Sequence, residues 1–299
     1  MTWTTILLAD PAATPLREQD AESACACLSR TGGTPASPDW LAEGQALDIP
    51  FEGSDPQATL QALRTTFADR PFDIAVLPSE GRRKKLLVAD MESTIIAEEM
   101  LDELADSLGL RDEIAAVTAR AMQGELDFES ALCERVRKLA GLKVEVMEEA
   151  ATAMTLNSGA RQLVASMKAQ GAYCALVSGG FTFFADPIAE TCGFDLARAN
   201  RLEIRDGRLT GEVLPPILGR EAKLASLEEF TRELNLSPQD SVAVGDGAND
   251  QAMLSAAGLG VAYRPKPRLR EAIETHLDHA DLTGLLYLQG YREQEIAGA

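Results

Sequence analysis

Histidine is the scarcest of the common catalytic residues in this chain, with two copies, His276 and His279, both near the C-terminus. This disfavours Ser-His-Asp and Cys-His hydrolases and metal sites rich in histidine. Positive charge is also in short supply, since 28 Lys and Arg face 47 Asp and Glu, for a formal net charge of −19. Nucleic acids and anionic membranes are therefore poor general partners, because both bind basic surfaces. We expect any chemistry to be carried by carboxylates.

Cysteines and long apolar runs are few as well. The cysteines are odd in number and scattered, which argues against a disulfide framework: Cys25, Cys27, Cys133, Cys174 and Cys192. No Lys or Arg precedes the short apolar stretch at the N-terminus, unlike the start of a signal peptide. No apolar run approaches the roughly 18 residues that a membrane span needs. We expect a soluble, cytoplasmic protein with reduced cysteines.

At 299 residues the chain is long enough for about two domains. Residues 1–80 are predicted to form a small α+β domain in which strands alternate with helices. The expected strands are residues 4–9, 45–51 and 72–77, the helices are residues 17–29 and 55–68, and residues 30–44 are a loop. This part of the chain shows no catalytic cluster, and residues 78–81 are expected to form a turn or linker.

After residue 81 the pattern becomes an alternation of apolar strands and helices. Continuous apolar runs at residues 86–89, 173–177, 241–244 and 259–262 are typical of strands that are buried on both faces. They predict an α/β fold with a Rossmann-like parallel sheet. The interval between the first two runs is too long for one crossover helix. We predict five helices there, at residues 97–108, 112–122, 128–140, 144–153 and 159–170. The predicted domain then has a core (residues 81–96 and 171–299) and an inserted helical cap (about residues 97–170), with a hairpin around Asp206-Gly207.

The first of these strands ends in a pair of carboxylates, Asp90 and Glu92. Ligands of open α/β sheets bind beyond the carboxyl ends of the strands, which is where this pair lies. Such a pair offers a nucleophile or metal ligand together with an acid/base group. The alternative is a pair of solvated carboxylates in a loop.

The second strand ends in Ser178-Gly179-Gly180, just before a helix. Small residues at such a turn expose backbone N–H groups, and a helix N-terminus favours an anion. Ser178 adds a hydroxyl. Many turns of this kind carry Ser-Gly for backbone reasons alone, which is the alternative interpretation.

A glycine-rich turn after the third strand contains Asp246, Asn249 and Asp250. Its carboxylates are hard oxygen donors of the kind that Mg²⁺ prefers. Lys223, near the start of the preceding helix, is either a solvated surface residue or a positive charge for phosphoryl oxygens.

In order and spacing these segments resemble the four motifs of the haloacid dehalogenase (HAD) superfamily, and within it the phosphoserine phosphatase family. The matching segments are Asp90-x-Glu92-Ser93-Thr94, Ser178-Gly179-Gly180, Lys223 and Gly245-Asp246-Gly247-x-Asn249-Asp250. The resemblance covers about residues 84–285 and includes the cap.

The resemblance implies hydrolysis of phosphoserine with Mg²⁺ as cofactor, through phosphoryl transfer to Asp90. Glu92 would be the general acid and base, and the metal would be held by Asp90, the Glu92 carbonyl and Asp246. The phosphate would be bound by Ser178, Gly179, Lys223 and Asn249. Asp250 would orient Lys223 or a metal-bound water.

The cap residues carry the resemblance to enzymes that act on phosphoserine. Glu99 would pair with the substrate ammonium and Arg135 with its carboxylate. Met122 and Phe128 would pack over the ligand and exclude water. Solvated helix positions and cap core are the alternative interpretations of these residues.

One position departs from the family pattern, because the general acid is usually Asp and here it is Glu92. Three alternative functions therefore stay open: a phosphatase for another phosphorylated amino acid such as phosphothreonine or phosphohomoserine, a phosphotransferase, and a non-catalytic sensor. The N-terminal domain resembles the ACT-like or ferredoxin-like domains of some bacterial members. It is expected to pack against the core, with amino-acid binding or homodimer formation as alternatives.

Overall fold

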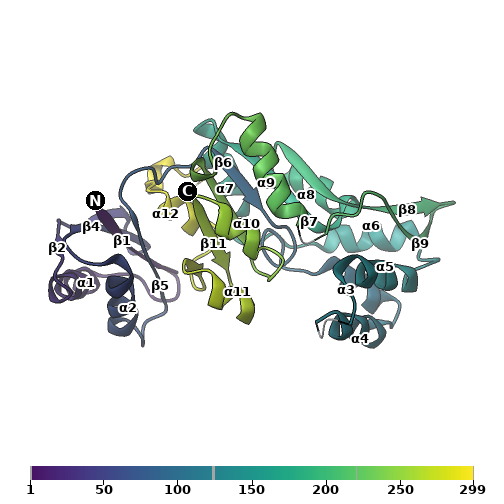
Figure 1. The fold of residues 1–299 in the computed structure, drawn as a ribbon, viewed down its shortest axis with the longest axis horizontal. Helices are drawn as coiled ribbons and strands as arrows, with labels where there is room; N and C mark the ends of the chain where they lie inside the picture. Colours follow the sequence, from purple (N-terminus) through teal and green to yellow (C-terminus); the bar gives the residue numbers. More distant parts are fainter. Residues whose placement is uncertain (1, 123–124, 220, 299) are drawn as a thin grey trace.

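The computed structural model describes residues 2–122, 125–219 and 221–298, and the Met122 side chain also falls outside the described part. Two sheets organise the chain, one in an N-terminal unit and one in the remainder (Figure 1). The elements of the N-terminal unit are β1 (Trp3–Ala9), α1 (Glu18–Arg30), β2 (Thr34–Pro35), β3 (Asp39–Ala42), β4 (Ala46–Glu52), α2 (Pro56–Thr66) and β5 (Phe72–Pro78). Its sheet has the order β2-β4-β1-β5, with β3 also paired to β4, and the pairs are antiparallel.

The predicted strands and helices of the N-terminal unit are confirmed, but the loop expected at residues 30–44 is wrong in part. Residues 34–35 and 39–42 form the short strands β2 and β3. Their brevity and the presence of Pro35 hide the alternation by which a strand is recognised, since proline is confined to sheet edges and strand ends. The start of α2 was better marked. Asp55 accepts a hydrogen bond from the Ala58 N–H at 2.8 Å, and Pro56 is the first helical residue.

The second sheet has seven strands in the order β12-β11-β10-β6-β7-β8-β9. They are β6 (Leu86–Ala89), β7 (Tyr173–Phe181), β8 (Leu196–Arg205), β9 (Arg208–Leu214), β10 (Ser241–Gly245), β11 (Leu259–Tyr263) and β12 (His276–Leu277). The pairs are parallel except for the hairpin β8–β9. The predicted Rossmann-like parallel sheet and its four apolar strands are therefore confirmed. The central position of β6 places Asp90 between the ends of β7 and β10.

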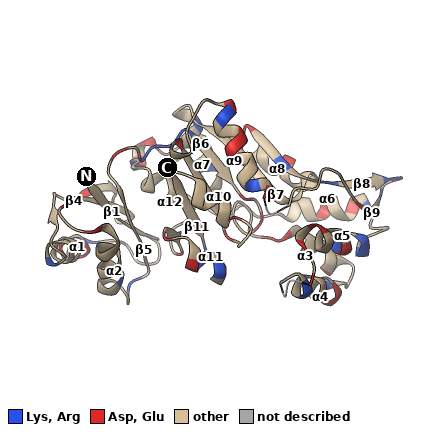
Figure 2. Ribbon diagram, viewed as in Figure 1, with Lys and Arg blue, Asp and Glu red and all other residues tan. Residues whose placement is uncertain are grey.

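Helices cover this sheet and form the insertion between β6 and β7. On the core these are α8 (Thr182–Cys192), α9 (Ala222–Glu233), α10 (Gln251–Ala256), α11 (Pro267–Ala272) and α12 (Gly284–Leu288). The insertion holds α3 (Met100–Ser107), α4 (Arg111–Met122), α5 (Phe128–Lys138), α6 (Val144–Ala153) and α7 (Ala160–Ala169), so its five predicted helices are confirmed. α7 packs against β7, α8 and α12, and we use the word cap for α3–α6. Among the cap helices α4 and α5 carry both acidic and basic residues, whereas the charged residues of α3 and α6 are all acidic (Figure 2).

The N-terminal sheet is buried on both faces. Successive side chains of β1 point to opposite faces, so Leu7 joins α1 and α2 while Ile6 and Leu8 join the core that contains Leu285 and Leu286 of α12. Polar contacts fix the same interface. The carboxylate of Asp73 in β5 accepts hydrogen bonds from the backbone N–H groups of residues 278, 279 and 280, at 2.8–3.2 Å. One hydrophobic cluster thus extends across both units, and a second lies within the N-terminal unit. No helix in the described part of the chain is both long enough and apolar enough to cross a bilayer.

Candidate active site

The carboxyl ends of β6 and β10 bring two predicted carboxylates together. The strands run parallel with Ala89 opposite Val244, and the Asp90 N–H donates to the Val244 carbonyl at 3.0 Å. Asp90 and Asp246 therefore leave adjacent strands at the same edge of the sheet. Both are buried. Each of Asp90, Asp246 and Asp250 offers a carboxylate oxygen, and these oxygens lie within 4.8 Å of one another.

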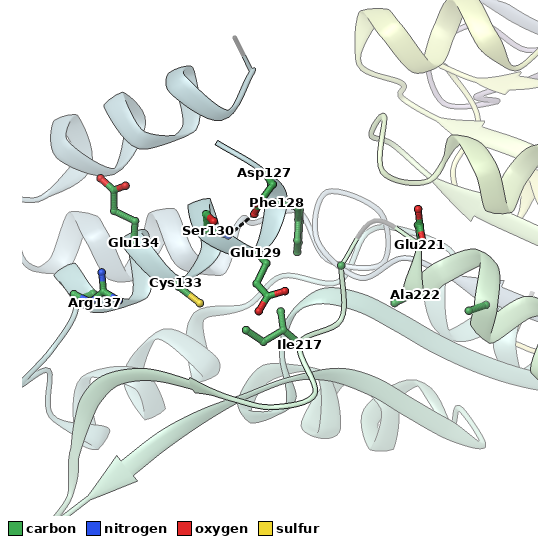
Figure 3. Close-up of a pocket in the computed structure, with 12 residues that line it drawn as sticks. Asp127, Phe128, Glu129, Ser130, Cys133, Glu134, Arg137, Ile217, Glu221 and Ala222 are labelled. Carbon is green, nitrogen blue, oxygen red and sulfur yellow. Dashed lines mark hydrogen bonds between the residues drawn. The ribbon is translucent and has the colours of Figure 1, made fainter. Parts of the chain in front are cut away.

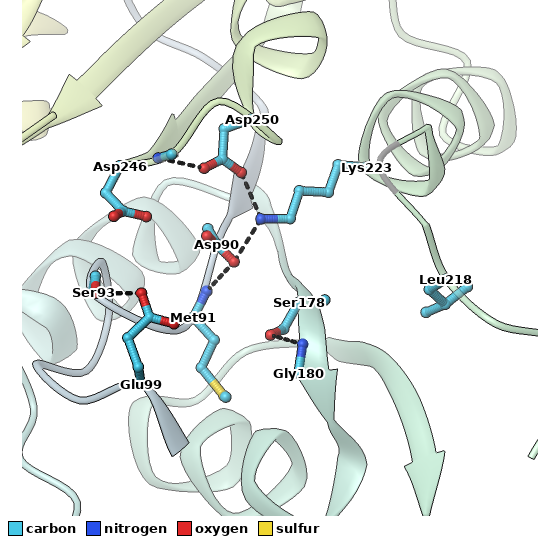
Figure 4. A network of polar contacts seen from close by, with 12 residues as sticks. Asp90, Met91, Ser93, Glu99, Ser178, Gly180, Leu218, Lys223, Asp246 and Asp250 are labelled. Carbon is cyan, nitrogen blue, oxygen red and sulfur yellow. Dashed lines mark hydrogen bonds and ion pairs between the residues drawn. The ribbon is translucent and has the colours of Figure 1, made fainter. Parts of the chain in front are cut away.

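Lys223 holds this cluster from α9 (Figure 4). Its Nζ lies 2.7 Å from Asp90 Oδ1 and 2.5 Å from Asp250 Oδ1, and the residue is only 3% exposed. Burial alone would lower the pKa of this lysine, but Asp250 and Asp90 raise it, so it stays charged. Burial and the neighbouring Asp250 raise the pKa of Asp90 well above its usual range, against the effect of Lys223. The cluster holds more negative than positive charge, and a further cation would stabilise it.

Asp250 has both of its oxygens occupied. Oδ1 binds Lys223, and Oδ2 accepts the Gly247 N–H at 3.0 Å. This contact corresponds to one of the two predicted functions of Asp250, the orientation of Lys223. Asn249, partly buried, places its amide oxygen where a side chain on Gly247 would otherwise lie.

The predicted phosphate-binding residues 178–180 lie beside this cluster at the end of β7. The strand continues to Phe181, so the predicted end of the strand at residue 177 is wrong, and the pairing with β8 is irregular between Val177 and Phe181. The Ser178 hydroxyl accepts the Gly180 N–H at 2.9 Å. Asn200 of β8, fully buried, donates from Nδ2 to the Gly179 carbonyl at 2.9 Å and accepts the Leu218 N–H at 2.7 Å. Asn200 therefore ties the turn to the segment that leads into α9 and Lys223. The sequence analysis missed this residue, because nothing local distinguishes one asparagine in a strand.

Glu92 reaches across to the cap. Its Oε1 accepts the Met100 N–H, at the first turn of α3, at 2.9 Å. A Cβ on Gly180 would lie 2.9 Å from Glu92 Oε2, so the carboxylate occupies space that only a glycine leaves open. Burial, together with the nearby Glu99, raises the pKa of Glu92 to about 7. A carboxyl group with such a pKa can both give and take a proton near neutral pH.

The cap contributes Glu99, Phe128 and Arg135 to the surroundings of Glu92. Glu99 Oε1 accepts from the Ser93 hydroxyl at 2.9 Å. Arg135 donates from Nε only weakly, to the Ala131 carbonyl of its own helix at 3.3 Å. Burial lowers the pKa of Arg135, while Asp102, Glu92 and Glu99 act to raise it. Its guanidinium is thus a cation among carboxylates and is available for a ligand. The predicted Met122 side chain lies outside the described residues.

Phe128 also borders a cleft of about 1110 Å³ between α5 and the start of α9 (Figure 3). The lining includes Cys133, Ile217 and Ala222. On its other side the Phe128 ring lies 3.4 Å from the position of a Cβ on Gly179. The cleft therefore borders the phosphate-binding residues through Phe128. The carboxylates Asp90, Asp246 and Asp250 are not among the residues that line it.

Lys266 is a second residue that the sequence analysis did not identify. It precedes α11, and its Nζ lies 2.9 Å from both Glu99 Oε1 and Asp246 Oδ2. Burial alone would lower the pKa of Lys266, but Glu99 and Asp246 raise it. Burial raises the pKa of Asp246, against the effect of Lys266. A Lys-Pro pair at the start of a helix gives no local signal of such a contact.

A parallel sheet with a helical insertion after its central strand, and buried carboxylates and a lysine at its carboxyl edge, defines a class of hydrolase. Residues 87–255 match the family model of haloacid dehalogenase-like hydrolases, and the chain belongs to that family.

Within this family, the chain is similar in sequence to phosphoserine phosphatases. Over 256 residues the chain is 42% identical to the phosphoserine phosphatase of Streptomyces coelicolor, which covers 85% of this chain and 62% of that protein. It spans about six tenths of the length of this and two further curated relatives.

Solved structures of HAD family hydrolases have a similar fold. A HAD family hydrolase from Salmonella enterica superposes with a TM-score of 0.83 at 29% identity, covering 96% of this chain and 98% of the other. A phospho-aspartyl intermediate analogue of phosphoserine phosphatase superposes with a TM-score of 0.63 at 39% identity, covering 68% of this chain and 98% of the other.

Proposed function

We propose that this chain is a Mg²⁺-dependent phosphatase that hydrolyses O-phospho-L-serine to L-serine and phosphate. The observation that carries the proposal is the buried Asp90 carboxylate at the end of β6, held by Lys223 next to Asp246. Asp90 Oδ1 accepts the Met91 N–H at 2.8 Å and pairs with Lys223. In the described part of the chain the hydrogen bond that Asp90 accepts goes to Oδ1, as does its shortest contact with Lys223, and we propose Oδ2 as the attacking oxygen. The similarity to phosphoserine phosphatases supports the substrate.

The donor set fits a divalent cation. Oxygen ligands from one or two carboxylates, with waters, suit Mg²⁺. The residues that would hold it are Asp90, the Glu92 carbonyl and Asp246. Burial raises the pKa of both aspartates, and a bound cation would stabilise their charged forms. A bound Mg²⁺ would neutralise phosphoryl oxygens and orient the phosphate.

The proposed reaction has two steps. First, Asp90 attacks phosphorus, the bond from phosphorus to the serine oxygen breaks, and Glu92 gives its proton to that oxygen. Glu92 then takes a proton from the water that attacks the aspartyl-phosphate, and the bond to Asp90 breaks. Ser178, the Gly179 N–H, Lys223 and Asn249 would hold the phosphoryl oxygens throughout.

The substrate's amino-acid part would lie under the cap. Its carboxylate would pair with the Arg135 guanidinium, and its ammonium with Glu99. Phe128 would pack over the ligand and exclude water, because its ring already reaches Gly179. Met122 is proposed as a second packing residue on the resemblance alone.

The N-terminal unit is proposed to be a ferredoxin-like or ACT-like domain. Its antiparallel order β2-β4-β1-β5, with a helix after β1 and another after β4, supports this assignment. The shared core supports packing as its main role. The alternative of a homodimer is tested by light scattering on the purified chain.

The direct test is phosphate release from O-phospho-L-serine with Mg²⁺ and then with EDTA. We expect release with the metal, loss of release after chelation, and no release by Asp90→Asn, which removes the nucleophile but keeps the side chain's size. Melting of the variant should stay at or above that of the native chain, because the buried negative charge is reduced. Substantial turnover by Asp90→Asn would disprove the assignment of the nucleophile.

The alternative functions are distinguished by assays with other phosphorylated amino acids, with added alcohols, and of binding without turnover. Faster phosphate release from phosphothreonine or phosphohomoserine than from phosphoserine would identify that amino acid as the substrate. Phosphate transfer to added alcohols in preference to water would indicate a phosphotransferase. Binding of phosphoserine with Mg²⁺ but without release would indicate a sensor.

A further inference from the structure

Lys266 joins two carboxylates that come from different parts of the fold. Asp246 follows β10 in the core, whereas Glu99 precedes the first residue of α3 in the cap. The Lys266 backbone is fixed next to Asp246, since its N–H donates to the Asp246 carbonyl at 2.9 Å. Its side chain then extends so that Nζ lies 2.9 Å from one oxygen of each carboxylate.

Both carboxylates have a different cation assigned to them in the proposed function. Asp246 would bind Mg²⁺, and Glu99 would bind the ammonium of the substrate. An ammonium at 2.9 Å from an oxygen occupies the place that either ligand needs, and two cations at one oxygen repel each other. Lys266 and the two ligands therefore compete for the same atoms.

The two lysines of the site differ in how firmly they are held. Lys223 is buried and lies between two buried aspartates. The Lys266 side chain is 57% exposed, and so its ammonium can move into water without a large desolvation penalty. The pair with Glu99 is exposed at both ends and therefore weak, and the pair with the buried Asp246 is exposed at the lysine end, so a ligand can displace this lysine.

We propose that Lys266 is an internal counter-cation that occupies Asp246 and Glu99 in the empty site and is displaced when the divalent metal and the substrate ammonium bind. The inference rests on the proposed function for the identity of these two ligands. It gives Lys266 two effects. It weakens metal binding to the empty site, and it reduces selectivity for esters that carry an ammonium, because Glu99 keeps a partner when the ligand has none.

The metal effect is tested by isothermal titration calorimetry of Mg²⁺ into the metal-free chain, without any phosphate ester. Lys266→Met should bind Mg²⁺ with a dissociation constant about three- to tenfold lower than that of the native chain, because the metal no longer has to displace an ammonium from Asp246. Lys266→Arg keeps the charge and should restore the native constant.

The matched control is Lys138→Met, which removes a lysine that pairs with Glu113 at 2.8 Å on the cap and makes the same change in net charge. It should leave the constant near the native value. A constant for Lys266→Met equal to or higher than the native one would overturn the metal half of the proposal.

The ammonium effect is tested by binding alone, in an Asp90→Asn background that cannot turn over. The two ligands are O-phospho-L-serine and the phosphate ester of 3-hydroxypropionate, which lacks the ammonium. We compare the dissociation constant of the ester without the ammonium, divided by that of phosphoserine, in two proteins. This ratio should be about threefold larger in Asp90→Asn with Lys266→Met than in Asp90→Asn alone. An unchanged or smaller ratio would overturn this half. If neither ester binds, the proposed substrate is wrong and the ammonium half falls with it, while the Mg²⁺ titration still decides the metal half.

Discussion

At the scale of single residues, the position of the Glu92 carboxylate depends on what surrounds it more than on its own length. A glutamate carries one methylene more than the aspartate usual in this family. The extra reach is accommodated by the Met100 N–H at one oxygen and by the missing side chain of Gly180 at the other. The proposed acid therefore lies between the first cap helix and the end of β7.

This geometry gives the first prediction, for Gly180→Ala. The new methyl group would lie 2.9 Å from Glu92 Oε2, closer than van der Waals contact allows, so the carboxylate has to move. We expect kcat for phosphoserine to fall by about 10- to 100-fold, part of the 10²–10⁴ that general acid–base catalysis commonly contributes. The melting temperature should change little, because only the end of a flexible side chain is displaced.

The matched test is the double variant Gly180→Ala with Glu92→Asp, in which the shorter acid makes room for the methyl group. Its kcat should exceed that of Gly180→Ala alone. A native rate in Gly180→Ala would show that the position of Glu92 is not important for the reaction.

The residues that the sequence could identify are those whose signal is local. Asp90 and Asp246 each follow an apolar strand, and parallel strands bring such ends together, so their meeting at 4.8 Å or less was predictable. Asn200 and Lys266 act through contacts with residues that are distant in the chain. Such contacts appear only when β8 pairs with β7 in the sheet and the start of α11 lies beside Asp246.

At the scale of elements, Asn200 connects three segments whose relative positions determine the geometry of the site. From the middle of β8 it binds the end of β7 through Gly179, and the segment before α9 through Leu218. Since α9 carries Lys223, the position of that lysine relative to the turn depends on this one buried amide.

The second prediction follows for Asn200→Ala. The Gly179 carbonyl and the Leu218 N–H would lose buried partners, at a cost of about 1–3 kcal/mol in the free energy of unfolding. We also expect KM for phosphoserine to rise several-fold, because the Gly179 N–H would no longer be held in place. Urea denaturation and steady-state kinetics measure the two effects. A stability loss with unchanged KM would restrict Asn200 to a structural role.

The elements themselves were largely predictable because their apolar patterns are long. All five helices of the insertion were expected, yet α3 begins at Met100, later than the residue 97 of the prediction. The reason is tertiary: the Ala97 N–H binds the Thr155 carbonyl at 3.0 Å, and Ile96 pairs with Leu156. The two chain segments that join the cap to the core thus pair with each other, which shortens the helix.

At the scale of the whole molecule, the N-terminal unit and the core are expected to unfold together. Composition and length indicated two domains, but a sequence does not show how two domains pack. The structure has Ile6 and Leu8 in one cluster with the core, and Arg82 donates to Asp48 and to the Leu288 carbonyl.

The third prediction concerns Asp73, which anchors this interface. Asp73→Ala would leave three backbone N–H groups of residues 278–280 without their acceptor. We expect the free energy of unfolding to fall by at least about 1–3 kcal/mol, the penalty for one such buried group, in a single transition monitored by calorimetry. Asp69→Ala, at an exposed position nearby in the sequence, is the control and should melt like the native chain. Two separate transitions in the native chain would contradict the shared core.

His276 allows a fourth prediction, on the pH dependence of stability. Burial lowers the pKa of His276 in the folded chain, while the unfolded chain keeps a value near 6.5. The unfolded state therefore binds a proton first as the pH falls below that value, and stability decreases between the unfolded and the folded pKa. Above both pKa values the histidine is neutral in either state and makes no contribution. Urea denaturation between pH 7.5 and 5 should show a smaller loss of stability for His276→Gln than for the native chain. Parallel curves for the native chain and His276→Gln would contradict a lowered pKa at this residue.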